Sequence, residues 1–140
     1  MELETVRDFI DFNSDKNPNL DFITCPNTRK KISNKSLKKN LEKINYYLSV
    51  EKKQKKKSLI CTLTENSLSG IQLMLGIMYS GMIQVPLNLV AGEDQLAYII
   101  EHSESKILFS TKSNLDLAKR IIKKSNRDVE LIEIDKDDFV

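Results

Sequence analysis

His102 is the only histidine of the chain, and it stands between Glu101 and Ser103. A histidine near a carboxylate and a hydroxyl group suggests the proton relay of a hydrolase. However, neighbouring residues of a helix do not face one another, and the chain has no GxSxG segment to present a nucleophilic serine. We therefore predict a structural role for His102 at a helix C-terminus, where positive charge is favourable.

Three aspartates, Asp135, Asp137 and Asp138, follow the last apolar segment. Carboxylates at the carboxyl edge of a parallel sheet could hold Mg²⁺, because such edges are where ligands bind in these folds. The alternative is a solvated tail, and we favour it. No metal ligand and no catalytic residue is predicted for this chain.

The two cysteines, Cys25 and Cys61, have a spacing that fits neither a disulfide framework nor a zinc site. Cys61 lies in an apolar strand, where a thiol is usually an inert small hydrophobe. A reducing, cytoplasmic location fits this cysteine usage best.

A phosphate-binding loop needs glycines at a strand-to-helix turn, so that successive backbone N–H groups are exposed. The only glycines are Gly70, Gly76, Gly81 and Gly92, and the turn at residues 64–67 has none. Neither GxGxxG nor GxxxxGK[ST] occurs. We expect no cofactor to bind to this chain alone.

The 140 residues are 40% hydrophobic and 30% charged, with a net charge of +2, as expected for one globular domain. This charge is too small to predict nucleic-acid binding. The five lysines of residues 51–57 are interpreted as a solvated loop, because no aromatic residues are interleaved with them. No segment has the uninterrupted apolar run of a membrane span.

The positions of apolar residues predict the elements before residue 58. Residues 3–12 have the spacing of a short amphipathic helix, and residues 20–32 that of a small β-hairpin. Ser33 is a suitable N-cap for a second amphipathic helix, in which Leu37 and Leu41 belong to the buried stripe.

Residues 58–135 alternate short apolar runs with segments of helical period. The runs begin at Leu59, Ile83, Lys106 and Val129, at intervals of 24, 23 and 23 residues. This spacing is typical of βα units that form a parallel sheet. The predicted fold is α/β, a three-layer sheet of mostly parallel βα units, preceded by the helix, the hairpin and the amphipathic helix.

The segment 67–80 has almost no polar face, so we expect a helix that is buried on nearly all sides. Asn66 is positioned to cap it, and Gly81 to end it in the left-handed conformation. Gly70 and Gly76 would allow close backbone approach. A chain of this length has few elements to cover such a helix, which suggests a missing partner.

The ordered segments resemble the N-terminal part of the AMP-forming adenylating superfamily, which includes acyl-CoA synthetases, aryl-CoA ligases and peptide-synthetase adenylation domains. The resemblance covers residues 20–125 and is most specific from Gly81 to Ser110. It is carried by the segments ISNKSL, TENS, MYSG, IQVPLN, EDQLAYIIEHS and KILFS. Two positions depart from the family pattern at the start of the second helix, Asn34 and Ser36, and Leu89 stands where a proline is common.

The resemblance implies that residues 1–140 are a single domain, the N-terminal part of a larger adenylate-forming ligase domain. The complete enzyme would use ATP, Mg²⁺ and coenzyme A to convert a carboxylic acid, such as a fatty acid, into an acyl adenylate and then a thioester. The resemblance also makes Val90, Ala91 and Gly92 candidates for a loop on the coenzyme A side. The isolated chain is expected to be inactive, because the phosphate loop and catalytic lysine of the family belong further downstream.

Two alternatives stay open: a stand-alone flavodoxin-like binding or interaction module, and a fragment of an amino-acid adenylation domain. We also expect the chain to form a homo-oligomer, because an uncovered helix and a free strand edge favour self-association. The substitutions Ile71→Lys and Met78→Lys on the apolar helix are expected to weaken this homo-oligomer.

Overall fold

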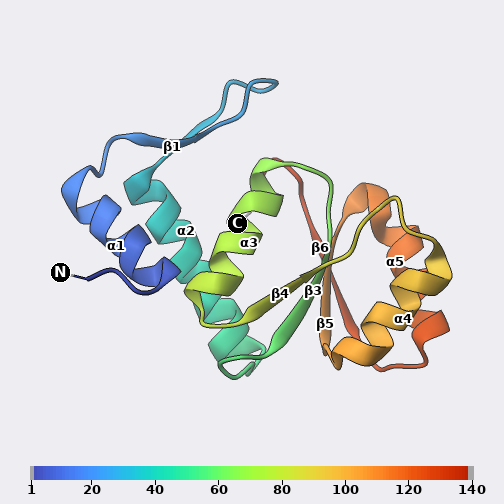
Figure 1. Ribbon diagram of the computed structural model, residues 1–140. Coiled ribbons are helices and arrows are strands. Elements are labelled where there is room, and N and C mark those ends of the chain that lie inside the picture. Colours follow the sequence, from blue (N-terminus) through green and yellow to red (C-terminus); the bar gives the residue numbers. More distant parts are fainter. Residues whose placement is uncertain (1, 139–140) are drawn as a thin grey trace.

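A parallel sheet of four strands lies at the centre of the structure, a computed structural model that describes residues 2–138 (Figure 1). The strand order is β4-β3-β5-β6, and every neighbouring pair is parallel. The two central strands are buried over almost their whole length, as their continuous apolar runs predict. The strands are β3 (Leu59–Leu63), β4 (Ile83–Pro86), β5 (Ile107–Thr111) and β6 (Glu130–Ile134).

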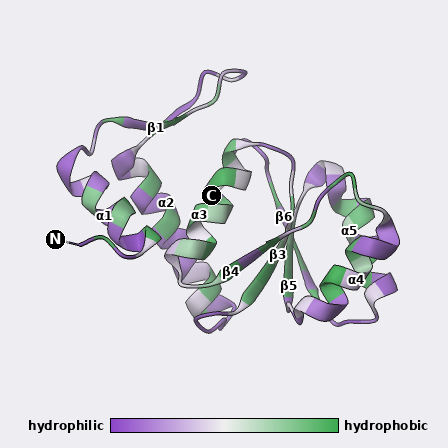
Figure 2. Cartoon of the chain, viewed as in Figure 1, coloured by the Kyte–Doolittle hydropathy of each residue, from purple (hydrophilic) through white to green (hydrophobic). Residues whose placement is uncertain are grey.

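Helices cover both faces of this sheet, which confirms the predicted three-layer α/β fold. Helices α4 (Glu93–Ser103) and α5 (Leu115–Ser125) enclose one hydrophobic core with strands β3 and β5. Helices α2 (Asn34–Tyr46) and α3 (Leu68–Tyr79) enclose the other core on the opposite face. Figure 2 shows that α3 is hydrophobic along most of its length, whereas the outer helices alternate apolar and polar residues.

Helix α1 (Val6–Lys16) begins and ends later than the predicted segment 3–12. Its start is fixed by a capping box, in which the Thr5 hydroxyl accepts from the Asp8 N–H and the Asp8 carboxylate accepts from the Thr5 N–H. The polar residues 13–16 were expected to end the helix but extend it. Pro18 explains the actual end, because the residue before a proline is disfavoured in the helical conformation.

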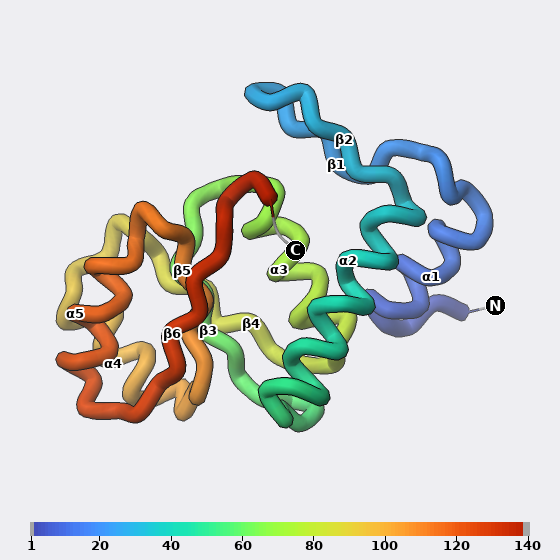
Figure 3. Tube along the Cα trace, turned by 180° about the vertical axis from the view of Figure 1, so that it is seen from behind, coloured from blue at the N-terminus to red at the C-terminus, as the bar shows by residue number. Residues whose placement is uncertain are grey.

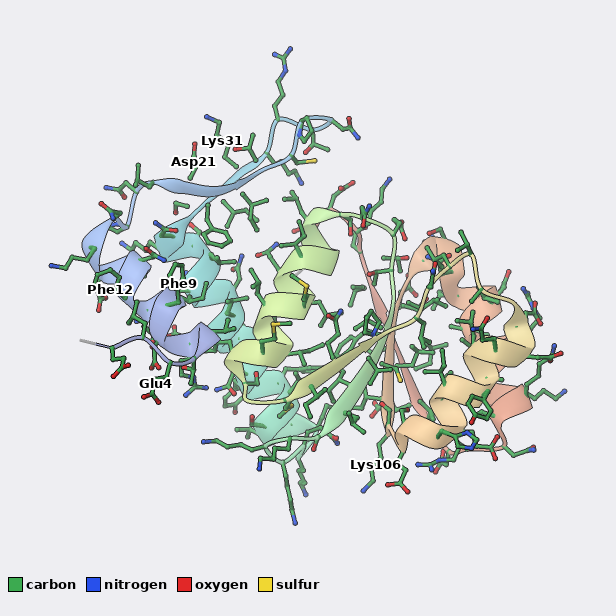
Figure 4. All side chains as sticks on the ribbon, viewed as in Figure 1. Glu4, Phe9, Phe12, Asp21, Lys31 and Lys106 are labelled. Atoms are coloured by element: carbon green, nitrogen blue, oxygen red, sulfur yellow. The ribbon has the colours of Figure 1, made fainter. Side chains whose placement is uncertain are left out.

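The hairpin, β1 (Asp21–Thr24) and β2 (Lys31–Ser33), is antiparallel, as predicted. Asp21 and Lys31 lie side by side across it, with their charged atoms 3.1 Å apart (Figure 4). Ser33 caps α2 by accepting from the Ser36 N–H at 3.2 Å, which confirms the predicted cap. A short π-helix, η1 (Tyr47–Glu51), continues α2.

Helix α3 confirms some predictions and corrects others. Ser67, not Asn66, caps it, because the Ser67 hydroxyl is the group that accepts from the Gly70 N–H at 3.1 Å. Gly81 does follow the helix in the left-handed region, at φ +73°.

The burial of α3 was overestimated from its sequence. Ile71 is 41% exposed and Met78 is 40% exposed, because α2 and the sheet cover only part of the helix circumference. Across residues 2–138, none of the helices combines the length and the apolar character needed to cross a membrane.

Candidate functional site

The carboxyl edge of the sheet brings two turns together around one carboxylate. Glu65 follows β3, and the short 3₁₀ helix η2 (Lys112–Asn114) follows β5. The Glu65 carboxylate accepts hydrogen bonds from the Thr111 hydroxyl, from the Asn114 amide at 3.0 Å and from the Ser113 hydroxyl at 3.2 Å. Since β3 and β5 are neighbours in the sheet, these contacts join the starts of α3 and α5.

The charge of Glu65 is stabilised by this environment. Partial burial opposes ionisation, but the hydrogen bonds from Thr111 and Ser113 and the nearby Lys136 outweigh it and lower the pKa of Glu65. An ionised carboxylate therefore occupies the gap between the two turns at neutral pH.

This edge does not fit the phosphates of a nucleotide. A phosphate would need free backbone N–H groups or cations, whereas the edge presents the negative charge of Glu65. The Ser67 hydroxyl already accepts from the Gly70 N–H, and the turn is closely packed, since a Cβ on Gly70 would lie 3.2 Å from the Glu65 carbonyl oxygen.

The candidate loop of Val90, Ala91 and Gly92 connects β4 with α4 at the same edge. Asn88 shapes it, because its side-chain oxygen accepts from the Val90 N–H at 3.1 Å and its carbonyl accepts from the Ala91 N–H at 2.9 Å. Val90 is 88% exposed, whereas Ala91 packs partly against the core that α4 and α5 enclose. Nothing lies within 4 Å of a Cβ built on Gly92, so the loop offers open space there.

The aspartates after β6 form a turn. One Asp135 carboxylate oxygen accepts from the Asp137 N–H at 2.8 Å and from the Asp138 N–H at 2.9 Å. These two bonds lower the pKa of Asp135. Within residues 2–138, no group of three His, Cys, Asp or Glu residues could hold a metal ion. The turn fixes the orientation of the Asp135 carboxylate.

His102 lies in the last turn of α4, as predicted. Its Nδ1 atom lies 2.9 Å from the Tyr98 carbonyl oxygen, and its ring stacks on Tyr98 with the ring centres 3.9 Å apart. Cys61 is fully buried, with Sγ 3.6 Å from the Ser103 hydroxyl, and burial raises the pKa of its thiol. Neither residue is placed for nucleophilic chemistry.

The lysine-rich segment 51–57 is mostly exposed, as expected for a solvated loop. Lys52 and Gln54 are half-buried, and Lys52 pairs with Glu130 on β6 and lies over the Tyr47 ring, 5.4 Å from its centre. These contacts link η1 to strand β6.

Sequence reasoning missed the cluster around Glu65. The signal was present, since a carboxylate follows one strand and the polar run Thr111, Lys112, Ser113, Asn114 follows another. Its interpretation needed the strand order, because only neighbouring strands bring their carboxyl ends together.

The fold and this edge define a class of protein: an open α/β unit in which the turns after two neighbouring strands are joined at the carboxyl edge. A family model for AMP-binding enzymes matches residues 10–140. The chain therefore belongs to the AMP-binding enzyme family. A comparison with curated proteins finds no match.

Solved structures share this fold at low sequence identity. One is a long-chain-fatty-acid CoA ligase from Rhodopseudomonas palustris, with TM-score 0.85 and 15% identity, covering 94% of this chain and 33% of that chain. A fatty acyl CoA synthetase from Mycobacterium tuberculosis has TM-score 0.84 and 17% identity, covering 94% and 27%. Fatty acyl-adenylate ligases from E. coli and L. pneumophila have TM-score 0.77 and 15% identity, covering 94% and 25%. The chain thus spans a quarter to a third of these proteins.

Proposed function

We propose that this chain is the N-terminal part of an ATP-dependent acyl-CoA synthetase, an AMP-forming acid–thiol ligase. The observation that carries the proposal is the family match over residues 10–140, which covers nearly all of the described fold. The fold similarity to CoA ligases supports the same assignment. The reaction would join a carboxylic acid to AMP, release pyrophosphate and then form a thioester with coenzyme A.

In this proposal the chain supplies a scaffold, and the catalytic groups lie elsewhere in the enzyme. The Glu65 cluster fixes the carboxyl edge of the sheet, and the exposed Val90 and open Gly92 leave the β4–α4 loop accessible. We assign Val90, Ala91 and Gly92 to the coenzyme A side of the complete enzyme. ATP and Mg²⁺ would bind mainly to segments outside this chain.

The test begins with the coding sequence beyond codon 140. We expect the reading frame to continue into a loop rich in Ser, Thr and Gly that ends in Lys. The protein encoded by the full reading frame should catalyse ATP–pyrophosphate exchange that depends on a carboxylic acid. Fatty acids and aryl acids are the substrates to test. A longer protein that folds but shows no exchange with any acid would overturn the proposal.

The second candidate is an adenylate-forming enzyme with an acceptor other than coenzyme A, favoured by the fold similarity to fatty acyl-adenylate ligases. An amino-acid adenylation domain belongs to the same group. Mass spectrometry of the products separates them: a CoA thioester supports the first candidate, and an acyl adenylate that persists with CoA supports the second. A stand-alone binding module would show neither product.

A cytoplasmic location is part of the proposal. It rests on the two free cysteines, Cys25 and Cys61, which suit a reducing compartment.

A further inference from the structure

The positive charge of the chain is concentrated in the loop between η1 and β3. Residues 51–57 hold five lysines and one glutamate, a net charge of +4, whereas the whole chain carries +2, so the remaining residues together carry −2. Figure 3 shows the backbone of this loop turning at the lower end of the molecule, where the chain also enters β5 and β6. The protein therefore has a local positive surface, although its overall charge is small.

The backbone of this loop is held in place by hydrogen bonds. The Gln54 N–H donates to the Leu48 carbonyl at 2.9 Å. The Lys57 N–H donates to the Gly81 carbonyl at 2.8 Å, which ties the loop to the turn before β4. A partner that binds the lysines therefore meets an ordered backbone, and little backbone entropy is lost on binding.

Four of the five lysines lack a counter-ion. Lys52 pairs with Glu130. The other four, which we call the lysine patch, are exposed, and none of the ion pairs within residues 2–138 includes them: Lys53, Lys55, Lys56 and Lys57. Glu104 and Asp128 are exposed carboxylates at the same end of the sheet, but they belong to the turns that leave α4 and α5 on its other face. The patch is therefore free to attract an anionic partner.

Exposed apolar side chains precede the lysine patch. Tyr46, at the end of α2, is 57% exposed, and Val50, one turn later in η1, is 53% exposed. Residues one turn apart share a face of a helix. Lysines beside such side chains suit a bilayer surface, because the ammonium groups meet anionic headgroups while the apolar groups enter the boundary with the acyl chains. Segment 51–57 has neither the arginines nor the aromatic residues that commonly bind nucleic acids.

We propose that the lysine patch, with Tyr46 and Val50, docks the protein reversibly on an anionic lipid bilayer. Each lysine close to such a surface strengthens the binding about fivefold. The docking surface lies at the amino edge of the parallel sheet, whereas Glu65 and the loop 90–92 follow strands at its carboxyl edge. The carboxyl edge therefore stays accessible when the protein is docked.

Co-sedimentation with lipid vesicles tests the docking without reference to the proposed activity. The 140-residue chain and the protein encoded by the full reading frame should both bind vesicles that contain phosphatidylserine, and neither should bind vesicles of phosphatidylcholine alone. Salt at about 1 M in place of about 0.1 M shortens the Debye length from about 10 Å to about 3 Å and should release both proteins. If either protein stays in solution with the phosphatidylserine vesicles, the proposal is wrong.

Neutralised lysines locate the docking surface. Lys55→Gln with Lys56→Gln should weaken vesicle binding about 25-fold, since two charges are lost. Lys112→Gln with Lys119→Gln is the matched control, because these lysines of η2 and α5 are also exposed and belong to none of the ion pairs within residues 2–138. The control should change binding less than about twofold. Equal effects of the two double variants, with both shown to be folded by circular dichroism, would overturn the proposal.

A nucleic acid is the competing partner of the lysine patch. Val50→Ser should weaken vesicle binding about threefold, because an apolar side chain no longer enters the bilayer, and should leave binding to a random RNA unchanged. At equal concentrations of anionic groups, the RNA should bind less of the unmodified chain than the vesicles do. Stronger binding to RNA, or vesicle binding that is insensitive to Val50→Ser, would refute the assignment to a bilayer.

Discussion

The carboxylate of Glu65 joins two turns at the carboxyl edge of the sheet. It accepts hydrogen bonds from Thr111, Ser113 and Asn114, which follow the neighbouring strand. Removal of the carboxylate takes away an acceptor from all three, although the Asn114 amide still donates to the Thr111 hydroxyl at 2.9 Å. At the scale of a residue, the edge is therefore held by charge-assisted hydrogen bonds.

Replacement of Glu65 tests this assignment. We expect Glu65→Ala to lower the free energy of unfolding by about 2 kcal/mol, and Glu65→Gln by about 1 kcal/mol, because an amide oxygen still accepts but carries no charge. Urea denaturation at pH 7 measures both. Glu101→Gln, at an exposed position of α4, is the control and should change the free energy of unfolding by less than about 0.5 kcal/mol. Equal losses at the two sites would contradict the assignment.

The pH dependence of stability gives a second test of Glu65. Because the folded state lowers the pKa of this group below its usual 4.5, ionisation stabilises the fold above that pH. The stabilisation is lost as the pH falls through the lower, folded-state value. The difference in unfolding free energy between the wild type and Glu65→Gln should be constant near neutrality and shrink in acid. Urea denaturation at a series of pH values measures this difference. A difference that stays constant in acid would contradict the prediction.

Among the elements, α1 is attached to α3 through polar contacts of Tyr79. The Tyr79 hydroxyl donates to the Asp11 carboxylate at 2.9 Å, while Arg7 Nε donates to the Tyr79 carbonyl at 3.0 Å. The Arg7 guanidinium lies 4.6 Å from the centre of the Tyr79 ring. Burial and the nearby Asp11 carboxylate raise the pKa of Tyr79, so its hydroxyl remains a donor at neutral pH.

Tyr79→Phe removes only this hydroxyl. We expect a loss of about 1 kcal/mol in the free energy of unfolding, because Asp11 loses one hydrogen-bond donor. Tyr46→Phe is the control, since that side chain is 57% exposed. Thermal unfolding of both variants should show a lower midpoint for Tyr79→Phe alone, and unchanged midpoints for both would disprove the role of the contact.

The packing of α2 against α3 depends on Gly76. A Cβ built there would lie 2.5 Å from the Ile44 Cδ1 atom, which is closer than packed atoms approach. We expect Gly76→Ala to destabilise the fold by about 1–3 kcal/mol, although alanine favours helices more than glycine does. Ile44→Val in the same chain should recover part of this loss.

Gly92→Ala is the matched control, because a Cβ there has open space and the backbone φ is −68°. Urea denaturation should place Gly92→Ala within about 0.5 kcal/mol of the unmodified chain. Similar losses of unfolding free energy at Gly76 and Gly92 would show that the close approach of α2 and α3 does not cause the effect of Gly76→Ala.

At the scale of the whole molecule, the turns after β3 and β5 predict that the 140-residue chain neither binds ATP appreciably nor catalyses ATP–pyrophosphate exchange. Their side chains contact one another, and Glu65 places negative charge at this edge, which disfavours a phosphate there. Calorimetry should detect no micromolar ATP binding, and carboxylate-dependent ATP–pyrophosphate exchange should be absent. Micromolar binding would contradict this prediction and direct attention to Asp135, Asp137 and Asp138 as a metal–nucleotide site. The activity of the longer protein is a separate measurement.

The sequence by itself determined the parallel βα units, the hairpin, the cap at Ser33 and the left-handed Gly81, because each depends on residues close together in the chain. The sequence predicted Asn66 as the N-cap of α3, whereas Ser67 is the cap. Both residue types can cap a helix, and only the position of the Ser67 hydroxyl beside the Gly70 N–H decides between them. The tertiary structure alone decided that Glu65 meets Thr111, that α3 keeps an exposed face and that β3 and β5 are the two inner strands. These features follow from which strands are neighbours and which helices cover them, and long-range packing sets that order.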